Sequence, residues 1–278
     1  MNPGRAARPQ GWPFESARSS AASVPFLIGF QGGQTATAVR VDQPSDLSAA
    51  LAAFGLQAPR LVVVLIGGAG LMDARDLDRL WPLFERSLVP VAERLGLVVI
   101  DGGTDAGVMR LIGRARTRAA ATFPLVGVPA AGTVRFPGKH WRARRRWPLK
   151  HPGGRRRWPL DAHHPHFVLV PGAAWGDEAP WIARVGTVLA GGWPSVTVLV
   201  NGGEISYTDV ACSLRVGRPV LAVAGSGRAA DQLASAARGG PADEDAVRLA
   251  ASGLVEVVDA DDLAALDRAV GVRLRRPV

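Results

Sequence analysis

Cysteine is nearly missing from the sequence, since Cys212 is the one such residue in 278. An intramolecular disulfide framework of the kind that staples small secreted proteins is therefore excluded. Long hydrophobic runs are missing too, because no segment reaches the ~20 consecutive apolar residues that span a bilayer. Residues 1–24 are rich in Arg, Pro, Gly and Ser and lack the apolar stretch of a secretory signal. We therefore expect a cytoplasmic protein with no membrane insertion and with a disordered tail over 1–24.

Several catalytic signatures are missing as well. No Gly-x-Ser-x-Gly nucleophile elbow, no Ser-His-Asp order and no paired-carboxylate arrangement stands out, and no glycine turn carries the lysine of a P-loop. ATP hydrolysis of the P-loop kind is therefore not expected. His164 and His166 precede an apolar segment, but no cysteine or matching carboxylate pair stands at ligand spacing, so we interpret them as structural. We expect no metal and no cofactor.

Acidic residues are missing from the stretch 135–160, although the net charge of the chain is +9. Its ten basic residues are Arg135, Lys139, Arg142, Arg144, Arg145, Arg146, Lys150, Arg155, Arg156 and Arg157. The hexapeptide Arg-Arg-Arg-Trp-Pro-Leu occurs in it twice, at 144–149 and 155–160. Its prolines and glycines exclude a regular helix or a central strand, so we interpret about 135–163 as a surface loop insertion. The rest of the chain is nearly neutral.

The arginines of this loop are interleaved with Trp141, Trp147 and Trp158. Such a pattern can meet the phosphates and stack on the bases of a nucleic acid. A disordered basic insert explains the same composition without a partner. We therefore do not expect nucleic acid as a partner and keep it as an alternative.

The rest of the sequence alternates short apolar segments bounded by glycine with longer amphipathic stretches. This pattern is typical of βαβ units around a parallel sheet. It predicts strands at 60–66, 97–100, 124–128, 166–170, 195–200, 219–224 and 254–258, and helices at 76–95, 106–120, 178–190, 208–216 and 229–237. A hairpin within 25–41 and a short helix over 46–54 precede them. We predict one α/β domain over 25–270, with a Rossmann-like, doubly wound, mostly parallel sheet and helices on both faces.

Four of the predicted strands run directly into glycine-rich turns, at 67–70, 102–107, 201–204 and 225–228. In an open parallel sheet these turns lie at one edge, where helix N-termini and backbone N–H groups can face an anion. One such turn is explained equally well by backbone geometry, but four favour a phosphate site. Arg228 follows the last turn and suits bidentate phosphate contact.

Acidic residues and a tryptophan lie near a predicted helix start, in Trp175-Gly-Asp-Glu178. Asp177 and Glu178 are interpreted as N-terminal caps that complement the helix dipole. The indole of Trp175 suits either stacking on a base or packing on the core.

Five segments together are similar to the SLOG superfamily: IDGGTDAGVM at 100–109, HPHFVLVPG at 164–172, WGDEAPW at 175–181, PSVTVLVNGGE at 194–204 and PVLAVAGSGRAAD at 219–231. Over about 60–237 the chain resembles the prokaryotic LSDAT group, a branch shared with the N-terminal cytoplasmic region of melastatin-type TRP channels. The resemblance implies a Rossmann-like domain that binds nucleotide-derived signals, with ADP-ribose-type ligands in the channel relatives.

The resemblance also implies a set of ligand-binding residues. It places Trp175 where the channels have an aromatic near the ligand. With the turn after the first long strand, the candidates are Gly67, Gly68, Gly102, Gly103, Thr104, Gly107, Trp175, Gly202, Gly203, Glu204, Gly225, Ser226, Gly227 and Arg228.

More distantly, the chain is similar to Lonely Guy phosphoribohydrolases, whose second turn reads Pro-Gly-Gly-x-Gly-Thr before a catalytic glutamate. Here 201–209 reads Asn-Gly-Gly-Glu-Ile-Ser-Tyr-Thr-Asp, with Ser206 at the threonine position and Asp209 near the acid. The favoured function is a sensor module that holds an ADP-ribose-like ligand and signals to a protein effector. The alternative is a nucleotide N-glycosidic hydrolase using Glu204 or Asp209 as acid or base, so an enzyme is not the first expectation. The oligomeric state stays open, a homo-oligomer included.

Overall fold

A single nine-stranded sheet organises the residues that the computed structural model describes, 24–137 and 157–275. Its strands are β1 (Phe26–Gly29), β2 (Thr35–Arg40), β3 (Val62–Gly67), β4 (Val98–Asp101), β5 (Leu125–Gly127), β8 (His166–Leu169), β9 (Ser195–Val200), β10 (Val220–Ala224) and β11 (Val255–Asp259). The spatial order is β1-β2-β8-β5-β4-β3-β9-β10-β11. The β1–β2 hairpin is antiparallel and every other pairing in this sheet is parallel. The predicted Rossmann-like, mostly parallel α/β fold is confirmed.

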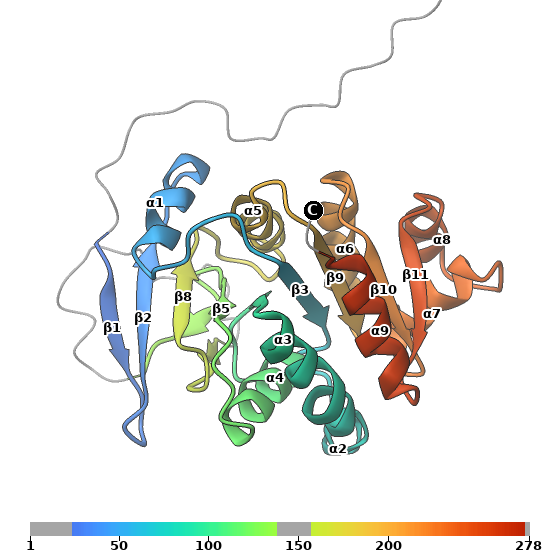
Figure 1. The fold of residues 1–278 in the computed structure, drawn as a ribbon, viewed down its shortest axis with the longest axis horizontal. Helices are drawn as coiled ribbons and strands as arrows, with labels where there is room; N and C mark the ends of the chain where they lie inside the picture. The colour runs from blue at the N-terminus through green and yellow to red at the C-terminus, as the bar shows by residue number, and fades with distance from the viewer. Residues whose placement is uncertain (1–23, 138–156, 276–278) are drawn as a thin grey trace, which may run out of the picture.

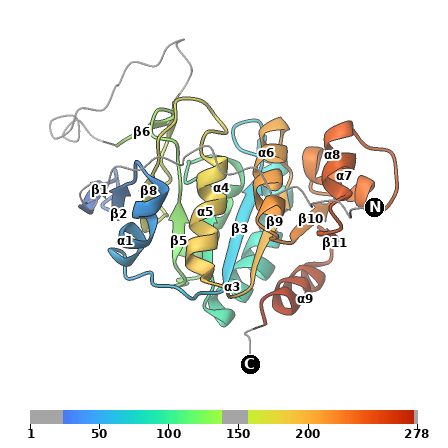
Figure 2. The same cartoon turned by 90° about the horizontal axis from the view of Figure 1, so that it is seen from above.

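Helices cover both faces of this sheet (Figures 1 and 2). They are α1 (Leu47–Ala52), α2 (Ala74–Leu83), α3 (Val89–Leu95), α4 (Gly107–Arg118), α5 (Ala179–Ala190), α6 (Glu204–Arg215), α7 (Arg228–Ala237), α8 (Glu244–Ala250) and α9 (Leu263–Arg273). One core layer packs α2, α3, α4 and α9 on one face, and the other packs α1, α5, α6, α7 and α8 on the opposite face. This double cover explains why the central strands are apolar throughout rather than alternating. No helix among the described residues is long and apolar enough to cross a membrane.

Three helical predictions need correction. The predicted helix over 76–95 is α2 and α3 joined by a π-helical turn, Phe84–Leu88, and it begins earlier because Asp73 accepts the N–H of Asp76 at 2.9 Å. Helix α6 begins at Glu204 instead of 208, because the Ser206 hydroxyl accepts the Gly203 N–H at 3.1 Å and so caps the helix start. Helices α8 and α9 were not predicted.

The loop prediction for 135–163 also needs correction at its ends. Strand β6 (Val134–Arg135) pairs in parallel with β7 (Trp158–Pro159), and Leu160 forms an isolated bridge with Thr104. The second copy of the hexapeptide therefore ends inside the folded body, because its Trp and Leu are apolar enough to pack there. Residues 1–23 and 138–156, which hold most of the predicted tail, the first copy and most of the basic stretch, lie outside the described residues.

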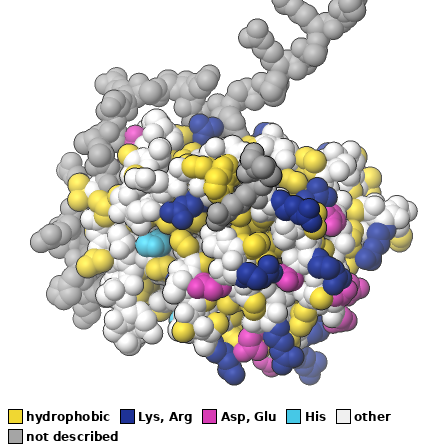
Figure 3. Space-filling view, viewed as in Figure 1, with side chains coloured by type: hydrophobic (Ala, Val, Ile, Leu, Met, Phe, Trp, Pro, Cys, Tyr) yellow, Lys and Arg dark blue, Asp and Glu magenta, His cyan; other side chains and the backbone are white. Residues whose placement is uncertain are grey.

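The charge outside that stretch is balanced, as the sequence predicts. Basic and acidic side chains are interspersed over the right-hand half of the surface in Figure 3. Several form ion pairs between elements, such as Arg273 with Glu256 at 2.7 Å and Arg118 with Glu85 at 2.9 Å. These exposed pairs contribute little to stability, and the fold rests on its two apolar core layers.

Candidate functional site

A cavity of about 480 Å³ lies where the central strands end. Its lining residues are Leu65, Ile66, Gly67, Ala69, Gly70, Leu71, Gly102, Thr104, Val108, Met109, Pro129, Thr133, Trp158, Trp175, Glu178, Ile182, Gly203, Glu204, Ile205, Ser206, Asp209 and Arg228. Most come from the carboxyl ends of β3, β4 and β9 and from the segments that follow. The glycine turns therefore gather at one edge of the sheet, as parallel topology requires.

The N-terminal ends of four helices meet at this cavity. Val108 and Met109 come from the first turn of α4, Glu178 is the N-cap of α5, Glu204 begins α6 and Arg228 begins α7. The first N–H groups of a helix have no acceptor within the helix, and the helix dipole is positive at this end. Convergence of such ends favours a bound anion.

The predicted ligand residues divide into two groups. Those that line the cavity are Gly67, Gly102, Thr104, Trp175, Gly203, Glu204 and Arg228. Those outside its lining are Gly68, Gly103, Gly107, Gly202, Gly225, Ser226 and Gly227. Both catalytic candidates, Glu204 and Asp209, line it.

Glycine at 68 and 107 serves the close approach of two turns. The Val108 N–H donates to the Gly68 carbonyl oxygen at 3.0 Å, and a Cβ added at Gly107 would overlap that oxygen. Gly107 also has φ +48°, in the left-handed region that favours glycine. These two glycines hold the β3 turn against the start of α4.

Asn201 and the buried Ser226 join the ends of β9 and β10. The Ser226 hydroxyl donates to the Val223 carbonyl at 2.6 Å and accepts the Asn201 N–H at 2.7 Å, so both its roles are used inside the protein. The Asn201 amide donates to the Ser226 carbonyl at 2.9 Å, and its oxygen accepts the Gly202 N–H at 2.9 Å. This pair of residues fixes the turns rather than facing the cavity.

The glycine N–H groups mostly donate within the protein, which differs from the phosphate cradle that the sequence predicts. The Gly103 N–H donates to Asp101 at 2.7 Å, Gly203 to Ser206 at 3.1 Å and Gly225 to Asp231 at 2.7 Å. Short polar side chains at the strand ends satisfy these donors locally. Several helix-start N–H groups are satisfied in the same way, since Val108 donates to the Gly68 carbonyl and Ala179 to the Gly176 carbonyl. Arg228 and the positive ends of the helix dipoles are therefore the main attraction left for an anion.

Arg228 has a strained backbone that sets its side chain at the cavity. Its φ is +52°, which is unusual for a residue with a side chain. A Cβ added at Gly203 would lie 3.0 Å from Arg228 Nη2, so the guanidinium group lies against the backbone at the start of α6. Of the described residues that line the cavity, Arg228 is the one that carries a positive charge.

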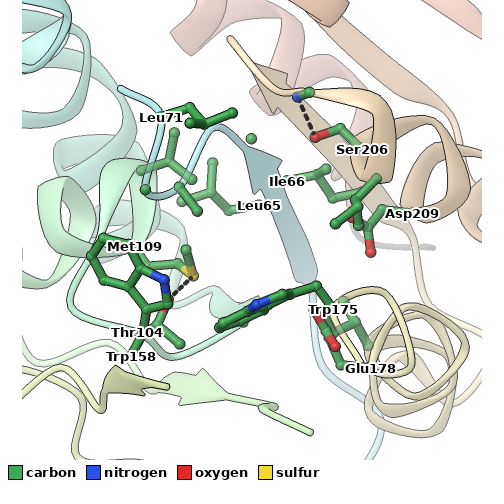
Figure 4. A pocket seen from close by; sticks show the side chains of 18 of the residues that line it. Leu65, Ile66, Leu71, Thr104, Met109, Trp158, Trp175, Glu178, Ser206 and Asp209 are labelled. Atoms are coloured by element: carbon green, nitrogen blue, oxygen red, sulfur yellow. Dashed lines mark hydrogen bonds between the residues drawn. The ribbon is translucent and has the colours of Figure 1, made fainter. Parts of the chain in front are cut away.

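Two carboxyl groups line the same side of the cavity, an arrangement that the sequence did not reveal. Figure 4 shows Glu178 from the start of α5 and Asp209 from α6 on this side, with Trp175 beside Glu178. Burial, together with the Glu178 charge, raises the pKa of Asp209 well above its ordinary value. Burial also raises the pKa of Glu178, against two backbone hydrogen bonds and with a smaller contribution from Asp177.

Asp177 does not cap α5 as the sequence predicts, but holds the turn that precedes it. Its carboxylate accepts the N–H groups of Ala173 and Ala174 at 2.8 and 2.9 Å, in the turn before α5. Glu178 accepts the Gly176 N–H at 3.1 Å but makes no side-chain bond that caps the helix. The capping interpretation of Glu178 is therefore wrong.

Trp158 forms the opposite wall from Trp175 (Figure 4). A Cβ added at Gly70 would overlap the Trp158 ring, so this indole fits here because residue 70 has no side chain. Leu71 and Ile205 lie at the cavity as unusually exposed apolar side chains, 79% and 44% exposed. The walls therefore offer aromatic and aliphatic surface to a planar group.

The buried His164 lies between two acidic side chains, Asp101 and Asp161. His164 Nε2 lies 2.9 Å from Asp101 Oδ1, and its Nδ1 lies 3.6 Å from Asp161 Oδ2, with all three side chains buried. Burial disfavours the charged imidazole, but Asp101 and Asp161 outweigh it and raise the pKa of His164 to about 10. The sequence interprets His164 as structural, and its raised pKa favours the protonated form between the two acidic side chains. Within residues 24–137 and 157–275, no group of three His, Cys, Asp or Glu is placed to hold a metal.

The fold and cavity define the class of protein: a Rossmann-like α/β module whose ligand-sized cavity opens at the carboxyl ends of its strands. The chain belongs to the prokaryotic LSDAT family, described as SLOG in TRPM, whose model matches residues 60–267. This match confirms the resemblance that the sequence motifs carry. Membership makes the chain a nucleotide-related α/β module.

Curated relatives include a TRP channel, subfamily M member 2, from Mus musculus, which is 28% identical over 66% of this chain. A subfamily M member-like 2 channel from Nematostella vectensis is 25% identical over 73% of this chain. The alignments span 14% and 15% of those channels.

Two solved structures align at low identity. One is a molybdenum cofactor binding protein from Rippkaea orientalis, with TM-score 0.47, 12% identity and coverage of 77% of this chain and 99% of that chain. The other is a Northeast Structural Genomics Consortium target, with TM-score 0.48, 17% identity and coverage of 76% and 99%.

Proposed function

We propose that this protein binds a nucleotide-derived ligand of the ADP-ribose type in the cavity and acts as a sensor module that signals to a protein effector. The observation that carries the proposal is the meeting of four helix N-termini and Arg228 with the indoles of Trp158 and Trp175. Helix starts and a guanidinium group attract phosphate, and indoles offer a stacking surface to a base. A volume of about 480 Å³ lies in the usual range for small-molecule sites.

Ligand binding is expected to raise the melting temperature, because a ligand selective for the folded state stabilises it by mass action. At a hundredfold excess over Kd, ADP-ribose should add about 2.7 kcal/mol to the free energy of unfolding. Thermal denaturation with a panel of adenine nucleotides measures this shift.

The Trp158→Ala variant should lose most of the shift, relative to its own melting temperature without ligand. Trp193→Ala is the matched control, because Trp193 lines a separate hollow with Pro59 and Gly96. No shift with any adenine nucleotide at millimolar concentration would contradict the proposal.

A second candidate function is hydrolysis of a nucleotide N-glycosidic bond, and the Glu178–Asp209 pair is the observation that favours it. Two acidic groups with raised pKa values can divide acid and base roles. Glu204 lies at the same cavity but is exposed, so it is a less protected acid.

Under the sensor proposal, long incubation with nucleoside monophosphates or ADP-ribose should release no free base and no ribose phosphate. Chromatography of the reaction mixture measures the products. Turnover that Asp209→Asn or Glu178→Gln abolishes, while Glu244→Gln on the exposed side of α8 leaves it intact, would make the protein an enzyme and overturn the sensor.

A further inference from the structure

Charge is distributed unevenly around the cavity. Of the described lining residues, Glu178, Glu204 and Asp209 are acidic and Arg228 is basic. Arg228 lies against Gly203 at the start of α6, whereas Asp209 comes from the second turn of that helix and lies on the same side of the cavity as Glu178 from α5 (Figure 4). A ligand that carries one anionic end can satisfy Arg228 and the helix starts, but its other end meets carboxyl groups.

The acidic side of the cavity holds an unsatisfied hydrogen-bond acceptor. Asp209 Oδ1 is buried and has no hydrogen-bond partner among the described residues. Glu178 Oε2 accepts the Gly176 N–H at 3.1 Å. A buried acceptor without a partner costs free energy, so a ligand that supplies a donor here gains affinity.

The geometry points to a subsite in which Glu178 and Asp209 together accept hydrogen bonds from the vicinal diol of a sugar, while the ligand phosphate lies at Arg228. This inference rests on the proposed nucleotide-binding function and assigns the sugar to the acidic side. Two adjacent hydroxyl groups supply two donors, which matches two neighbouring carboxyl groups. Acidic side chains take the same role toward ribose hydroxyls in other α/β nucleotide sites.

The charge state of the pair favours a diol over an anion or a strong cation. Burial raises the pKa of both groups, and the charge of Glu178 raises that of Asp209 further. The pair therefore holds protons more tightly than two isolated acids and can both donate and accept. A hydroxyl group does both as well, whereas a phosphate offers acceptors alone and repels any remaining charge.

Titration calorimetry with three probes tests the subsite: AMP, 2′-deoxy-AMP and adenosine 2′,5′-bisphosphate. The intact protein should bind 2′-deoxy-AMP about fivefold to tenfold more weakly than AMP, the effect of losing one hydrogen bond. Adenosine 2′,5′-bisphosphate should bind more weakly than AMP by a similar factor or more, because its 2′-phosphate lies at the acidic side. Attraction to Arg228 alone would instead make the bisphosphate bind more tightly.

Asp209→Asn and Glu178→Gln keep the shape of each side chain and replace a carboxyl group, which can exchange a proton, with an amide of fixed donor and acceptor atoms. In each variant the ratio of AMP affinity to 2′-deoxy-AMP affinity should fall severalfold. The affinity of the bisphosphate relative to that of AMP should rise. Glu244→Gln on α8 is the matched control and should leave all three affinities unchanged. Two independent variants keep the test valid if one of them does not fold.

The outcomes separate the subsite from the proposed function. Equal binding of AMP and 2′-deoxy-AMP to the intact protein would overturn the subsite and leave nucleotide binding standing. Tighter binding of the bisphosphate than of AMP would overturn it too. An AMP affinity that falls in both variants at an unchanged ratio would show a merely structural role and overturn it. No binding of any probe would overturn both proposals.

Discussion

His164→Leu is expected to lower the free energy of unfolding by about 3–5 kcal/mol, the cost of removing one partner from a buried charged pair. The side chains of His164, Asp101 and Asp161 are all buried, so leucine would leave two acidic groups without the cation between them. Denaturant unfolding at pH 7 measures the loss. His163→Leu is the matched control, because His163 is partly exposed and its ring bonds only to the Thr117 hydroxyl at 3.0 Å, and it should cost about 1 kcal/mol or less.

The same pair gives a defined pH dependence. The folded protein holds the pKa of His164 at about 10, above its ordinary value of 6.5, so folding favours the protonated imidazole. This contribution to the free energy of unfolding is fully present below about pH 6.5 and is lost as the pH rises through 10. The gap between the intact protein and His164→Leu should therefore narrow from pH 7 to pH 10. A gap that stays constant over this range would show that His164 is neutral in the folded state.

This stability prediction also concerns the site, because Asp101 accepts the Gly103 N–H at 2.7 Å as well as bonding His164. The turn that follows carries Gly102 and Thr104 into the cavity wall. His164 further stacks on Phe167, with ring centroids 5.7 Å apart. Loss of the histidine should thus disturb ligand binding indirectly, as a positioning residue.

Much of the fold could be predicted from the sequence because its central strands are covered on both faces. Valine, leucine and isoleucine runs ending in glycine mark such strands, and all seven predicted strands exist within a residue or two of their predicted ends. Helix α8 was missed because its seven residues bury two apolar side chains, Ala246 and Leu249, too few for a periodic signal. Helix α9 has a broader apolar face, with Leu266 and Val270 buried and Leu263 packed against the core, and was overlooked although its sequence is apolar enough.

The site was predicted in part, for a physical reason that differs from residue to residue. A local signal, the turn before a helix start, predicted Arg228 as a ligand residue, whereas for Trp175 the residues left stacking and core packing open and the family resemblance placed it near the ligand. The pairing of Glu178 with Asp209 depends on how α5 packs against α6, which no local spacing encodes. Trp158 was assigned to a loop because prolines and arginines surround it, and only its contact with Gly70 places it in a wall.

The glycine turns lie at the sheet edge where the cavity opens, but their N–H groups are not free to bind phosphate in the way that the sequence predicts. Their number predicted the strand edge at which the cavity lies. The side chains of Asp101, Asn201, Ser206 and Asp231, however, accept four of the N–H groups that the sequence assigned to phosphate. Because each acceptor lies one to six residues from its donor, a search for Asp, Asn and Ser beside each turn could have found them.

Arg228 is the residue on which phosphate binding in the proposed function most depends, because it is the one basic side chain among the described residues of the cavity lining. Arg228→Ala should weaken an ADP-ribose-like ligand by about 1.5–3 kcal/mol, roughly 10-fold to 150-fold in Kd, the range for hydrogen bonds to a charged group. Arg228→Lys should recover only part of the affinity, since a point charge cannot reproduce the planar fork of a guanidinium group. Arg238→Ala, at the other end of α7, is the matched control and should leave Kd unchanged.

The backbone at Arg228 allows a test that separates binding from folding. Its φ of +52° is strained for arginine and acceptable for glycine. Arg228→Gly should therefore raise the free energy of unfolding without ligand by about 1 kcal/mol while it loses the same affinity as Arg228→Ala. Opposite changes in stability and affinity would mean that the strain is retained for the ligand. If Arg228→Gly instead destabilises the free protein and titration calorimetry finds its Kd unchanged, the guanidinium group holds the start of α7 against the start of α6 and does not bind the ligand.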